Sequence, residues 1–260
     1  MKEIEYQDKF FTKYYIEKYS NVRNKPSDLF QTEKYFLPRV ILPNSKILDI
    51  GCAIGGFSEI LLSYESNIKY FGIDISIGMI NAAKKKYPKH NFQVISNKSL
   101  IGFEKDSFDL VQCWGVSVHE PDYRKLITES WRVSDRAVIF DMRLKKKGRE
   151  IINENICFTL NPGGIKYDYV IANMYDFINF LINLDPKPKL IEIIGYIAKP
   201  NKFSSIPKEF GDIYMCGVGV YKSDVPNNKD IELKLRLPDK AFNFLLKNMK
   251  NMKNMKISRN

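Results

Sequence analysis

Residues 47–58 read Ile-Leu-Asp-Ile-Gly-Cys-Ala-Ile-Gly-Gly-Phe-Ser, an apolar run followed by a glycine-rich turn. The apolar run has the length and composition of a buried strand, and the stretch after Gly56 is typical of a helix. A glycine turn between them lets a ligand approach the backbone, because no Cβ stands in the way. The amide groups of the first helical turn then face that ligand. This stretch therefore predicts an α/β fold with a ligand site at the turn.

The spacing of the glycines restricts the kind of ligand. Gly51, Gly55 and Gly56 have the order G-x-x-x-G-G, whereas a dinucleotide fingerprint requires G-x-G-x-x-G and a phosphate loop requires a Lys before Ser or Thr. The next expected strand ends at Asp74, and an acid there can accept hydrogen bonds from ribose hydroxyls. Together the turn and Asp74 predict an adenosine-bearing ligand without a pyrophosphate, which S-adenosylmethionine fits. The structural alternative is an ordinary strand-to-helix turn beside an exposed acid.

The rest of the chain alternates strands with helices, which predicts a largely parallel sheet covered on both faces. Expected strands lie at 46–51, 70–76, 92–96, 108–114, 136–142, 189–199 and 212–222. Expected helices lie at 55–65, 78–88, 123–133 and 174–184. We therefore predict a Rossmann-like, doubly wound α/β fold with a mostly parallel seven-stranded sheet and an antiparallel last strand.

We expect one domain over residues 1–260. Aromatic residues at helical spacing near 10–19, and a cap-like Ser27-Asp28 before a second apolar stretch, predict two helices that cover a core edge or form a lid. The C-terminal repeat KNMKNMKNMK predicts a weakly helical or unstructured basic end, with no rigid structure in the last ten residues. The expected parts are an N-terminal helical cap (1–42), a cofactor-binding half (43–142), an insertion or lid after the fifth strand (143–170), the remaining sheet (171–225) and a basic C-terminal extension (226–260).

The net charge of +11 favours an acidic partner, such as nucleic acid, a membrane surface or a phosphorylated small molecule. A general lysine bias of the composition is the competing explanation. The 4 cysteines form no C-x-x-C pair, which argues against a zinc site and favours a reducing, cytoplasmic setting. No apolar stretch is long enough for a membrane span, and the N-terminus lacks the apolar segment of a signal peptide. The oligomeric state stays open.

The segments ILDIGCAIGGFS (47–58), GIDIS (72–76) and SFDLVQCWGVSVHEPDY (107–123) resemble successive motifs of class I S-adenosylmethionine-dependent methyltransferases, in their broad small-molecule branch. The resemblance covers about residues 40–142 and is specific for the cofactor rather than the acceptor. It implies S-adenosylmethionine as cofactor, held at its methionine end by Asp49, Gly51, Cys52 and Ala53, at its ribose by Asp74, and at its adenine by Ile75, Met79 and Asn97. It also implies that Trp114 lies near the sulfonium, although a core tryptophan is the structural alternative.

Asn97 departs from the family pattern, which often has an acid at that position. The carbonyl oxygen of an asparagine can still accept a hydrogen bond from the adenine amino group. The departure keeps open a non-catalytic protein that binds the cofactor.

Methyl transfer to a neutral hydroxyl or ammonium group requires a base. His119 is the candidate, because it follows the fourth strand and an unperturbed imidazole has a pKa near ~6.5. Asp141, at the end of the fifth strand, is the second candidate base. Arg143, with the basic run 145–147, is the candidate for binding an anionic acceptor, and Tyr167 and Tyr169 are expected to line the same pocket. A structural histidine and a solvated basic loop are the competing interpretations.

The predicted function is methylation of a small, anionic metabolite, such as a sugar derivative, phosphate ester or carboxylate, with oxygen preferred over nitrogen. An RNA methyltransferase and a non-catalytic cofactor-binding protein are the alternatives. The sequence lacks the Asn/Asp-Pro-Pro-aromatic motif of enzymes that methylate base amino groups and the Pro-Cys pair of cytosine C5 enzymes. No acid cluster indicates a magnesium site, and no metal is expected.

Overall fold

The computed structural model describes residues 13, 14, 16–18, 23–95, 100, 102–152, 156–160, 166–198, 204–223, 230–249 and 255–259. The chain divides into two compact units. The first consists of residues 1–113 and 133–135, and the second of residues 114–132 and 136–260.

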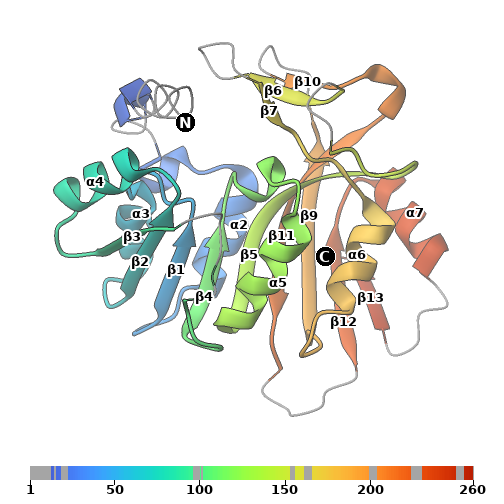
Figure 1. Ribbon diagram of the computed structural model, residues 1–260. Coiled ribbons are helices and arrows are strands. Elements are labelled where there is room, and N and C mark those ends of the chain that lie inside the picture. The colour runs from blue at the N-terminus through green and yellow to red at the C-terminus, as the bar shows by residue number, and fades with distance from the viewer. Residues whose placement is uncertain are drawn as a thin grey trace. The chain divides into compact units, whose positions relative to one another are not determined.

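The first unit is built on a parallel sheet with the strand order β3-β2-β1-β4 (Figure 1). In the register, Asp49 lies opposite Gly72 on one neighbouring strand and Gln112 on the other. The carboxyl ends of parallel strands meet at one sheet edge, which is where the glycine turn begins. The bounds are β1 (Lys46–Ile50), β2 (Lys69–Asp74), β3 (Asn91–Val94) and β4 (Phe108–Cys113), as the sequence predicts.

Helices α3 (Gly56–Tyr64) and α4 (Ile77–Lys86) follow the first two strands. Each places apolar residues three or four positions apart on its buried side, which is the pattern of an amphipathic helix. The buried residues of these helices and of the strands below them include Phe57, Ile60, Leu61, Met79, Ile80, Ala83, Ile47, Leu48, Leu110 and Val111.

The N-terminal part contains a short 3₁₀ turn, η1 (Pro26–Asp28), and helix α2 (Gln31–Val40). The helix begins after Phe30 rather than at Ser27, because Glu33 accepts the backbone N–H of Phe30 at 2.7 Å and so caps it there. The hydroxyl of Ser27 instead donates to the carboxylate of Asp28. Residues 13, 14 and 16–18 are helical, and the rest of the first expected helix lies outside the described residues.

The second unit has the strand order β5-β11-β9-β12-β13, with the short β8 (Ala172–Asn173) parallel to β5. Strand β11 runs antiparallel to both neighbours, as predicted for this stretch, but it is not the last strand, because β12 and β13 extend the sheet beyond the seven strands that the sequence predicts. The bounds are β5 (Ser134–Lys145), β9 (Leu190–Ile197), β11 (Ile213–Tyr221), β12 (Ile231–Arg236) and β13 (Met255–Arg259).

The C-terminal part departs from the expectation of an unstructured end. Strand β12 pairs parallel with β9, helix α7 (Asp239–Met249) follows, and β13 pairs parallel with β12. The apolar pattern explains the difference: Ile231, Leu233 and Leu235 alternate on β12, and Ala241, Leu245 and Met249 form one buried stripe on α7. The lysine-rich composition of this end of the chain concealed a strand, a helix and a further strand.

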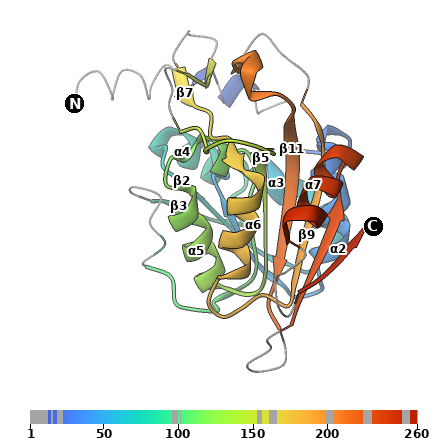
Figure 2. The ribbon, with the colours of Figure 1, turned by 90° about the vertical axis from the view of Figure 1, so that its right-hand side faces the viewer.

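Helices α5 (Tyr123–Val133) and α6 (Met174–Ile182) pack on each other through aromatic contacts. The rings of Tyr123 and Phe177 lie 6.1 Å apart, and Phe177 also meets Phe140 of β5 at 6.2 Å. Helices α6 and α7 are neighbours, as Figure 2 shows. Both helices cover this part of the sheet. The sequence indicated α6 but not α7.

The expected insertion after the fifth strand contributes most of a small second sheet. Its order is β10-β6-β7, and both pairings are antiparallel. The strands are β6 (Phe158–Leu160), β7 (Lys166–Asp168) and β10 (Ser204–Ser205), with the 3₁₀ turn η3 (Lys208–Phe210) after them. The segment from Asp168 to Ile171 returns to the turn η2 (Ser117–His119), because the amide of Val170 donates to the carbonyl of Val118 at 2.8 Å.

The mixed α/β class with a mostly parallel sheet is confirmed. All 4 cysteines are free and buried, as expected for small apolar side chains. Within the part of the chain that the structure describes, no helix combines the length and apolar character that crossing a bilayer requires.

Candidate functional site

The glycine turn after β1 has a left-handed backbone at alternate positions. The φ angles are 74° at Gly51, 47° at Ala53 and 81° at Gly55. Glycine adopts this conformation readily, but for alanine it is uncommon and costs on the order of 1–2 kcal/mol. The amides of Gly51 and Cys52 both donate to the carbonyl of Ile73, at 2.8 and 3.0 Å. The end of β2 therefore holds the turn in a conformation that its own sequence does not favour.

Asp74 fixes the strained residue of the turn directly. One oxygen of its carboxylate accepts the backbone N–H of Ala53 at 2.9 Å, and the other accepts the N–H of Ser76 at 2.9 Å. Ser76 in turn caps α4, because its hydroxyl accepts the amide of Met79. Asp74, the residue predicted to bind the ribose, thus lies at the junction of the glycine turn, β2 and α4.

Close packing beneath the turn depends on glycines. A Cβ on Gly72 would stand 2.8 Å from the Sγ of Cys52 and 2.8 Å from the ring of Phe92, which is too near for real side chains. Cys52 is 4% exposed, so its thiol is packed inside the turn. A Cβ on Gly56, the first residue of α3, would stand 2.5 Å from the carbonyl oxygen of Arg23. The N-terminal segment therefore packs against the start of α3.

Asp49 is buried at the end of β1 and forms a hydrogen bond that the sequence did not reveal. The hydroxyl of Tyr70 donates to its Oδ2 at 2.5 Å. Burial raises the pKa of Asp49 to about 7, although the Tyr70 hydrogen bond and the positive charge of Arg23 act in the opposite direction. A cation beside this carboxyl group would favour its ionised form, as the predicted contact with the amino group of the cofactor requires.

The residues predicted at the adenine differ in accessibility. Ile75 is 56% exposed and the neighbouring Ile77 is 60% exposed, so two large apolar side chains lie uncovered next to Asp74. Met79 is 3% exposed and belongs to the core beneath α4. Asn97 lies outside the described residues. In the first unit, the structure thus brings together Asp49, Gly51, Cys52, Ala53, Asp74 and Ile75.

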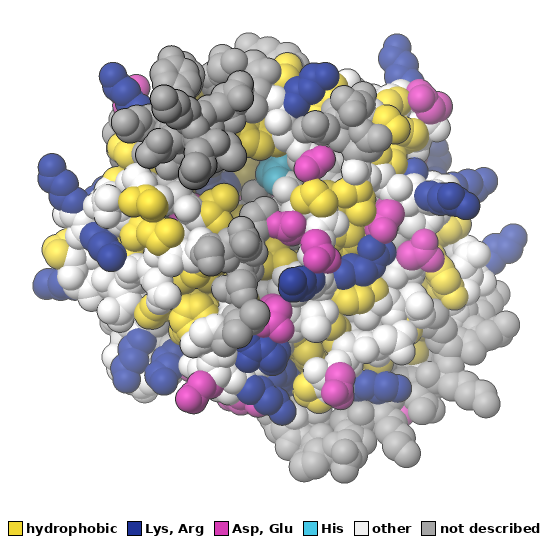
Figure 3. All heavy atoms as spheres, in the orientation of Figure 1, with side chains coloured by type: hydrophobic (Ala, Val, Ile, Leu, Met, Phe, Trp, Pro, Cys, Tyr) yellow, Lys and Arg dark blue, Asp and Glu magenta, His cyan; other side chains and the backbone are white. Residues whose placement is uncertain are grey.

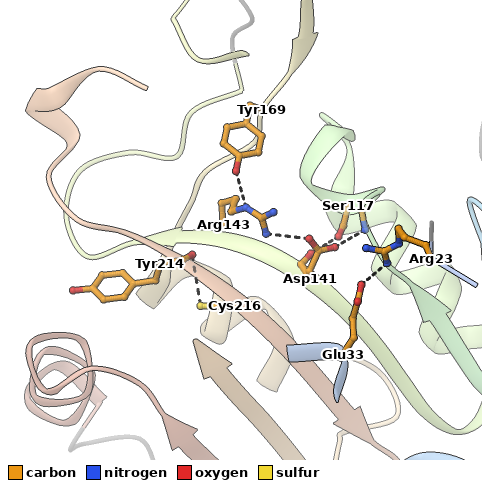
Figure 4. A network of polar contacts seen from close by, with 9 residues as sticks. Arg23, Glu33, Ser117, Asp141, Arg143, Tyr169, Tyr214 and Cys216 are labelled. Atoms are coloured by element: carbon orange, nitrogen blue, oxygen red, sulfur yellow. Dashed lines mark hydrogen bonds and ion pairs between the residues drawn. The ribbon is translucent and has the colours of Figure 1, made fainter. Parts of the chain in front are cut away.

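The second unit contains a separate polar cluster around Arg143. The Nε of Arg143 donates to the hydroxyl of Tyr169 at 2.7 Å, and its Nη1 donates to Oδ2 of Asp141 at 3.0 Å (Figure 4). The Arg143 and Asp141 side chains are 11% and 14% exposed. Burial by itself would lower the pKa of Arg143, but the Asp141 charge and Tyr169 raise it above its ordinary value. The charge of Arg143 is therefore balanced within the protein.

Asp141 also ties β5 to the loop after β4. Its Oδ1 accepts the backbone N–H of Gly115 at 2.7 Å, and its backbone carbonyl accepts the hydroxyl of Ser117. Both carboxylate oxygens of Asp141 thus accept hydrogen bonds from residues of the second unit. Ser117 is fully buried in the stretch after β4, where the family resemblance implies residues near the cofactor and the acceptor. Trp114, in the same loop, is 7% exposed.

His119 is oriented by the segment that follows β7. Its Nδ1 lies 2.7 Å from the carbonyl oxygen of Asp168, and its ring centroid lies 5.9 Å from that of Tyr169. A carbonyl oxygen can only accept, so Nδ1 carries a proton, and Nε2 of the neutral ring carries the lone pair. In this tautomer, Nε2 is the nitrogen that can accept a proton. The second unit thus brings His119, Asp141, Arg143 and Tyr169 together, whereas Tyr167 pairs with Thr159 inside the small sheet.

The basic run after Arg143 is divided among different environments. Lys145 is 5% exposed, its Nζ lies 4.8 Å from the centroid of the Phe210 ring, and burial lowers its pKa. Lys146 approaches Asp212 at 3.9 Å. Lys147 is exposed. The run therefore does not form one continuous anion-binding patch.

Comparison with known proteins agrees with this geometry. A family model described as a methyltransferase domain matches residues 47–136. Phosphoethanolamine N-methyltransferase 3 of Arabidopsis thaliana is 31% identical over 91 residues, and the match covers 27% of this chain and only 18% of the plant protein.

Solved structures resemble the chain in fold. The N-terminal domain of EvdMO1, in the presence of S-adenosylhomocysteine and D-fucose, has a TM-score of 0.53 at 12% identity and covers 74% of this chain and 82% of that one. The YcgJ protein of Bacillus subtilis has a TM-score of 0.50 at 13% identity, with coverage of 74% and 98%. Residues 47–136 therefore match a methyltransferase domain, in agreement with the resemblance of these residues to the motifs of S-adenosylmethionine-dependent methyltransferases.

Proposed function

We propose that the protein transfers the methyl group of S-adenosylmethionine to a hydroxyl group of a small-molecule acceptor. The observation that carries the proposal is the turn at residues 51–55, whose left-handed Ala53 is held by the carboxylate of Asp74. A strained turn maintained at the end of a buried strand is typical of a site where backbone approaches a ligand. A strand-to-helix connection that binds no ligand does not require such a strained backbone.

The surroundings of the turn support an adenosine-bearing cofactor. Exposed Ile75 and Ile77 offer apolar surface to a purine beside the acid at the end of β2. Asp49 supplies a buried carboxyl group on β1, directly before the turn. Ribose, adenine and a cationic amino group each have a chemically matching residue here.

The protein's own contribution to the chemistry rests on His119 in this proposal. The sulfonium cofactor supplies an activated methyl group, so the protein must align the acceptor and remove its proton. The hydrogen bond from Nδ1 of His119 to the Asp168 carbonyl sets Nε2 as the atom that receives the proton. Arg143, Asp141 and Tyr169 then serve to hold the loop that carries His119.

A small acceptor is supported by the relative in Arabidopsis thaliana, which is named for a small phosphorylated amine. The net charge of +11 supports an anionic acceptor. An RNA acceptor is less well supported, because Lys and Arg side chains on the face in Figure 3 are interspersed with Asp and Glu and form no single basic patch.

The test is calorimetric titration with S-adenosylmethionine and S-adenosylhomocysteine, followed by mass-spectrometric screening of hydroxylated, phosphorylated and aminated metabolites for methyl incorporation. We expect micromolar cofactor binding that Asp74→Ala abolishes and that the exposed Asp135→Ala leaves unchanged. Absence of cofactor binding to the unchanged protein would refute the proposal. Exclusive methylation of amines or of RNA would retain the cofactor but reject the acceptor class.

A further inference from the structure

Lys145 is a buried cation at the end of β5, in the second unit. The register between β5 and β11 runs without interruption from Ala137 to Lys145, so alternate residues of β5 share one face of the sheet. Asp141, Arg143 and Lys145 therefore form a row on one face, with neighbouring members about 7 Å apart along the strand. Lys145 thus lies one step beyond the ion pair of Arg143 with Asp141 (Figure 4).

The charge of Lys145 is not matched in the way that the charges of the neighbouring cations are. Arg143 pairs with Asp141 at 3.0 Å, and Lys146 approaches Asp212 at 3.9 Å. Among the residues that the structure describes, no carboxylate lies within ion-pair distance of the Nζ of Lys145. The side chain is 5% exposed, and burial lowers its pKa. A buried cation without a counter-charge is unfavourable until an anion reaches it.

The groups around the ammonium of Lys145 are apolar or already engaged. Its Nζ lies 4.8 Å from the centroid of the Phe210 ring, and a Cβ on Gly148 would stand 3.5 Å from it. Asn173, its register partner on β8, accepts the amides of α6 with Oδ1 and donates to the Gly148 carbonyl with Nδ2. Cys157 is buried, which raises the pKa of its thiol to about 11 and keeps it neutral near pH 7. Across the described ranges, the three donors of the ammonium thus have one aromatic ring as their partner.

Lys145 and the proposed base both neighbour Arg143. The hydroxyl of Tyr169 accepts from the Nε of Arg143 at 2.7 Å, and the Tyr169 ring lies 5.9 Å from that of His119. Lys145 follows Arg143 along the same face of β5. Its Nζ is not one of the wholly enclosed polar atoms of the described residues, so a small ligand can reach it. A base and an unmatched cation are therefore within reach of one small molecule.

The amount of unmatched charge indicates the kind of anion. Lys145 supplies one positive charge. A carboxylate carries one negative charge at neutral pH, whereas a phosphate monoester carries about −1.5 to −2. In a site largely closed to water, a second negative charge without a partner is costly. A carboxylate therefore matches Lys145 better than a phosphate monoester does, and the Phe210 ring offers apolar surface to the carbon atoms beside it.

We propose that Lys145 binds the carboxylate group of the acceptor, which makes the substrate a hydroxy acid whose hydroxyl group faces His119. This inference rests on the proposed function, because it specifies the acceptor of the same reaction. The carboxylate anchors the acceptor and takes no part in the transfer itself. The cations of the segment then have different tasks: Arg143 and Lys146 pair with acids of the fold, and Lys145 recognises the substrate.

The first arm of the experiment asks whether Lys145 stabilises the fold. Lys145→Met keeps a long apolar side chain and removes the charge, and Lys146→Met is the matched control, which removes a lysine that already has a partner in Asp212. Without ligand, we expect the urea midpoint of Lys145→Met to equal or exceed that of the unchanged protein, because an unmatched buried charge is removed. A clear loss of stability would show that Lys145 serves the fold through the Phe210 ring, and would overturn the inference.

The second arm measures ligand binding to the protein saturated with S-adenosylhomocysteine. Two sets of probes share a hydroxylated frame and differ in charge: glycerol, glycerate and glycerol phosphate, and glucose, glucuronate and glucose phosphate. We expect at least one carboxylate to raise the thermal unfolding midpoint more than its neutral and phosphorylated counterparts do. Its affinity should fall about 10- to 100-fold in Lys145→Met, through loss of a charge-assisted contact, and stay unchanged in Lys146→Met.

The two proposals fail in different ways. A shift with the phosphorylated probes alone, no shift with any carboxylate, or equal carboxylate affinities in Lys145→Met and the unchanged protein would overturn the role of Lys145 and leave methyl transfer standing. If the unchanged protein does not bind S-adenosylhomocysteine, it is the proposed function that fails.

Discussion

The hydroxyl of Tyr70 donates a hydrogen bond of 2.5 Å to Asp49 between the neighbouring strands β2 and β1, and each of the two residues is 2% exposed. A carboxyl group buried at this depth is disfavoured as an anion, which is why its pKa rises from 3.8 to about 7. Asp49 lies at the start of the glycine turn. We therefore expect its protonation state to affect both the free energy of unfolding and the binding of a charged ligand.

The first prediction concerns the pH dependence of stability without cofactor. The folded-state pKa of Asp49 is raised above its ordinary value of 3.8, so the folded protein binds more protons than the unfolded chain between pH 3.8 and about pH 7. The resulting contribution to the free energy of unfolding is fully present below pH 3.8 and is lost as the pH rises through about 7. We expect it to amount to a few kcal/mol, on the order of 4.

The measurement is chemical denaturation of the unchanged protein and of Asp49→Asn at several pH values. The difference between their free energies of unfolding isolates Asp49 from the other titrating groups, and it should shift in favour of Asp49→Asn as the pH rises. Parallel curves from pH 4 to pH 8 would contradict the prediction. Cofactor affinity should follow the opposite trend and increase with pH, because the ionised carboxylate attracts the amino group.

The second prediction concerns His119. We expect His119→Gln to reduce kcat about 10²- to 10⁴-fold, which is the usual contribution of a general base. Cofactor affinity should stay within about twofold, since the glycine turn and Asp74 belong to the first unit. The measurement is methyl transfer to the acceptor found by screening, combined with calorimetry for the cofactor.

His90 provides the matched control, because it is the only other histidine of the chain. Its ring packs against Tyr70, 5.5 Å away, and it has no place in the proposed chemistry. A similar loss of kcat in His90→Gln, or an unchanged kcat in His119→Gln, would remove His119 from the role of base.

The third prediction tests whether Asp141 and Arg143 stabilise the second unit. Asp141→Asn leaves the mostly buried Arg143 without its counter-charge, and we expect a loss of about 3–5 kcal/mol in the free energy of unfolding. Arg143→Met combined with Asp141→Asn should recover part of the loss, because neither charge then remains buried. Denaturant titrations of the single and double variants measure the coupling.

An exposed ion pair of the same unit serves for comparison. Lys146 and Asp212 are separated by 3.9 Å, and their side chains are 24% and 36% exposed. We expect Asp212→Asn to cost less than about 1 kcal/mol. Equal losses in the free energy of unfolding for Asp141→Asn and Asp212→Asn would show that the Arg143 cluster stabilises the protein no more than a surface ion pair.

The fourth prediction tests the C-terminal helix. Leu245 is fully buried on α7, whereas its neighbour Leu246 is 36% exposed. We expect Leu245→Ala to destabilise the protein by about 2–5 kcal/mol through loss of burial and the cavity left behind, and Leu246→Ala by less than about 1 kcal/mol. Thermal unfolding followed by circular dichroism distinguishes the two. Indifference of the protein to Leu245→Ala would mean that α7 does not pack as described.

The strands and helices between Lys46 and Met142 could be predicted because each apolar run has the length and spacing of one element. The start of α2 could not, since the choice between Ser27 and Phe30 as cap depends on which backbone N–H the side chain of Glu33 reaches. The C-terminal elements were concealed because this end of the chain is rich in lysine, and the prediction followed its composition instead of the spacing of its apolar residues. The spacing of the apolar residues, and not the charge of the residues between them, predicts whether such a stretch is ordered.

The candidate site was predictable only where chemistry and local pattern coincide. The turn and Asp74 follow from strand ends that the sequence makes visible. The pairing of Arg143 with Tyr169, 26 positions along the chain, depends on how the segment after β7 returns, and no local signal records it. The packing of the Arg23 carbonyl oxygen against Gly56 has no local signal either.

The bond from the Ala53 amide to Asp74 gives the molecule an internal reporter of occupancy. The same carboxylate that orders the turn is the proposed ribose ligand, so a bound nucleoside and a protected amide proton go together. Deuterium exchange at Ala53 should slow when the nucleoside is bound, while exchange deep in β1 changes little. A single backbone proton would then register loading of the site before any methyl acceptor is known.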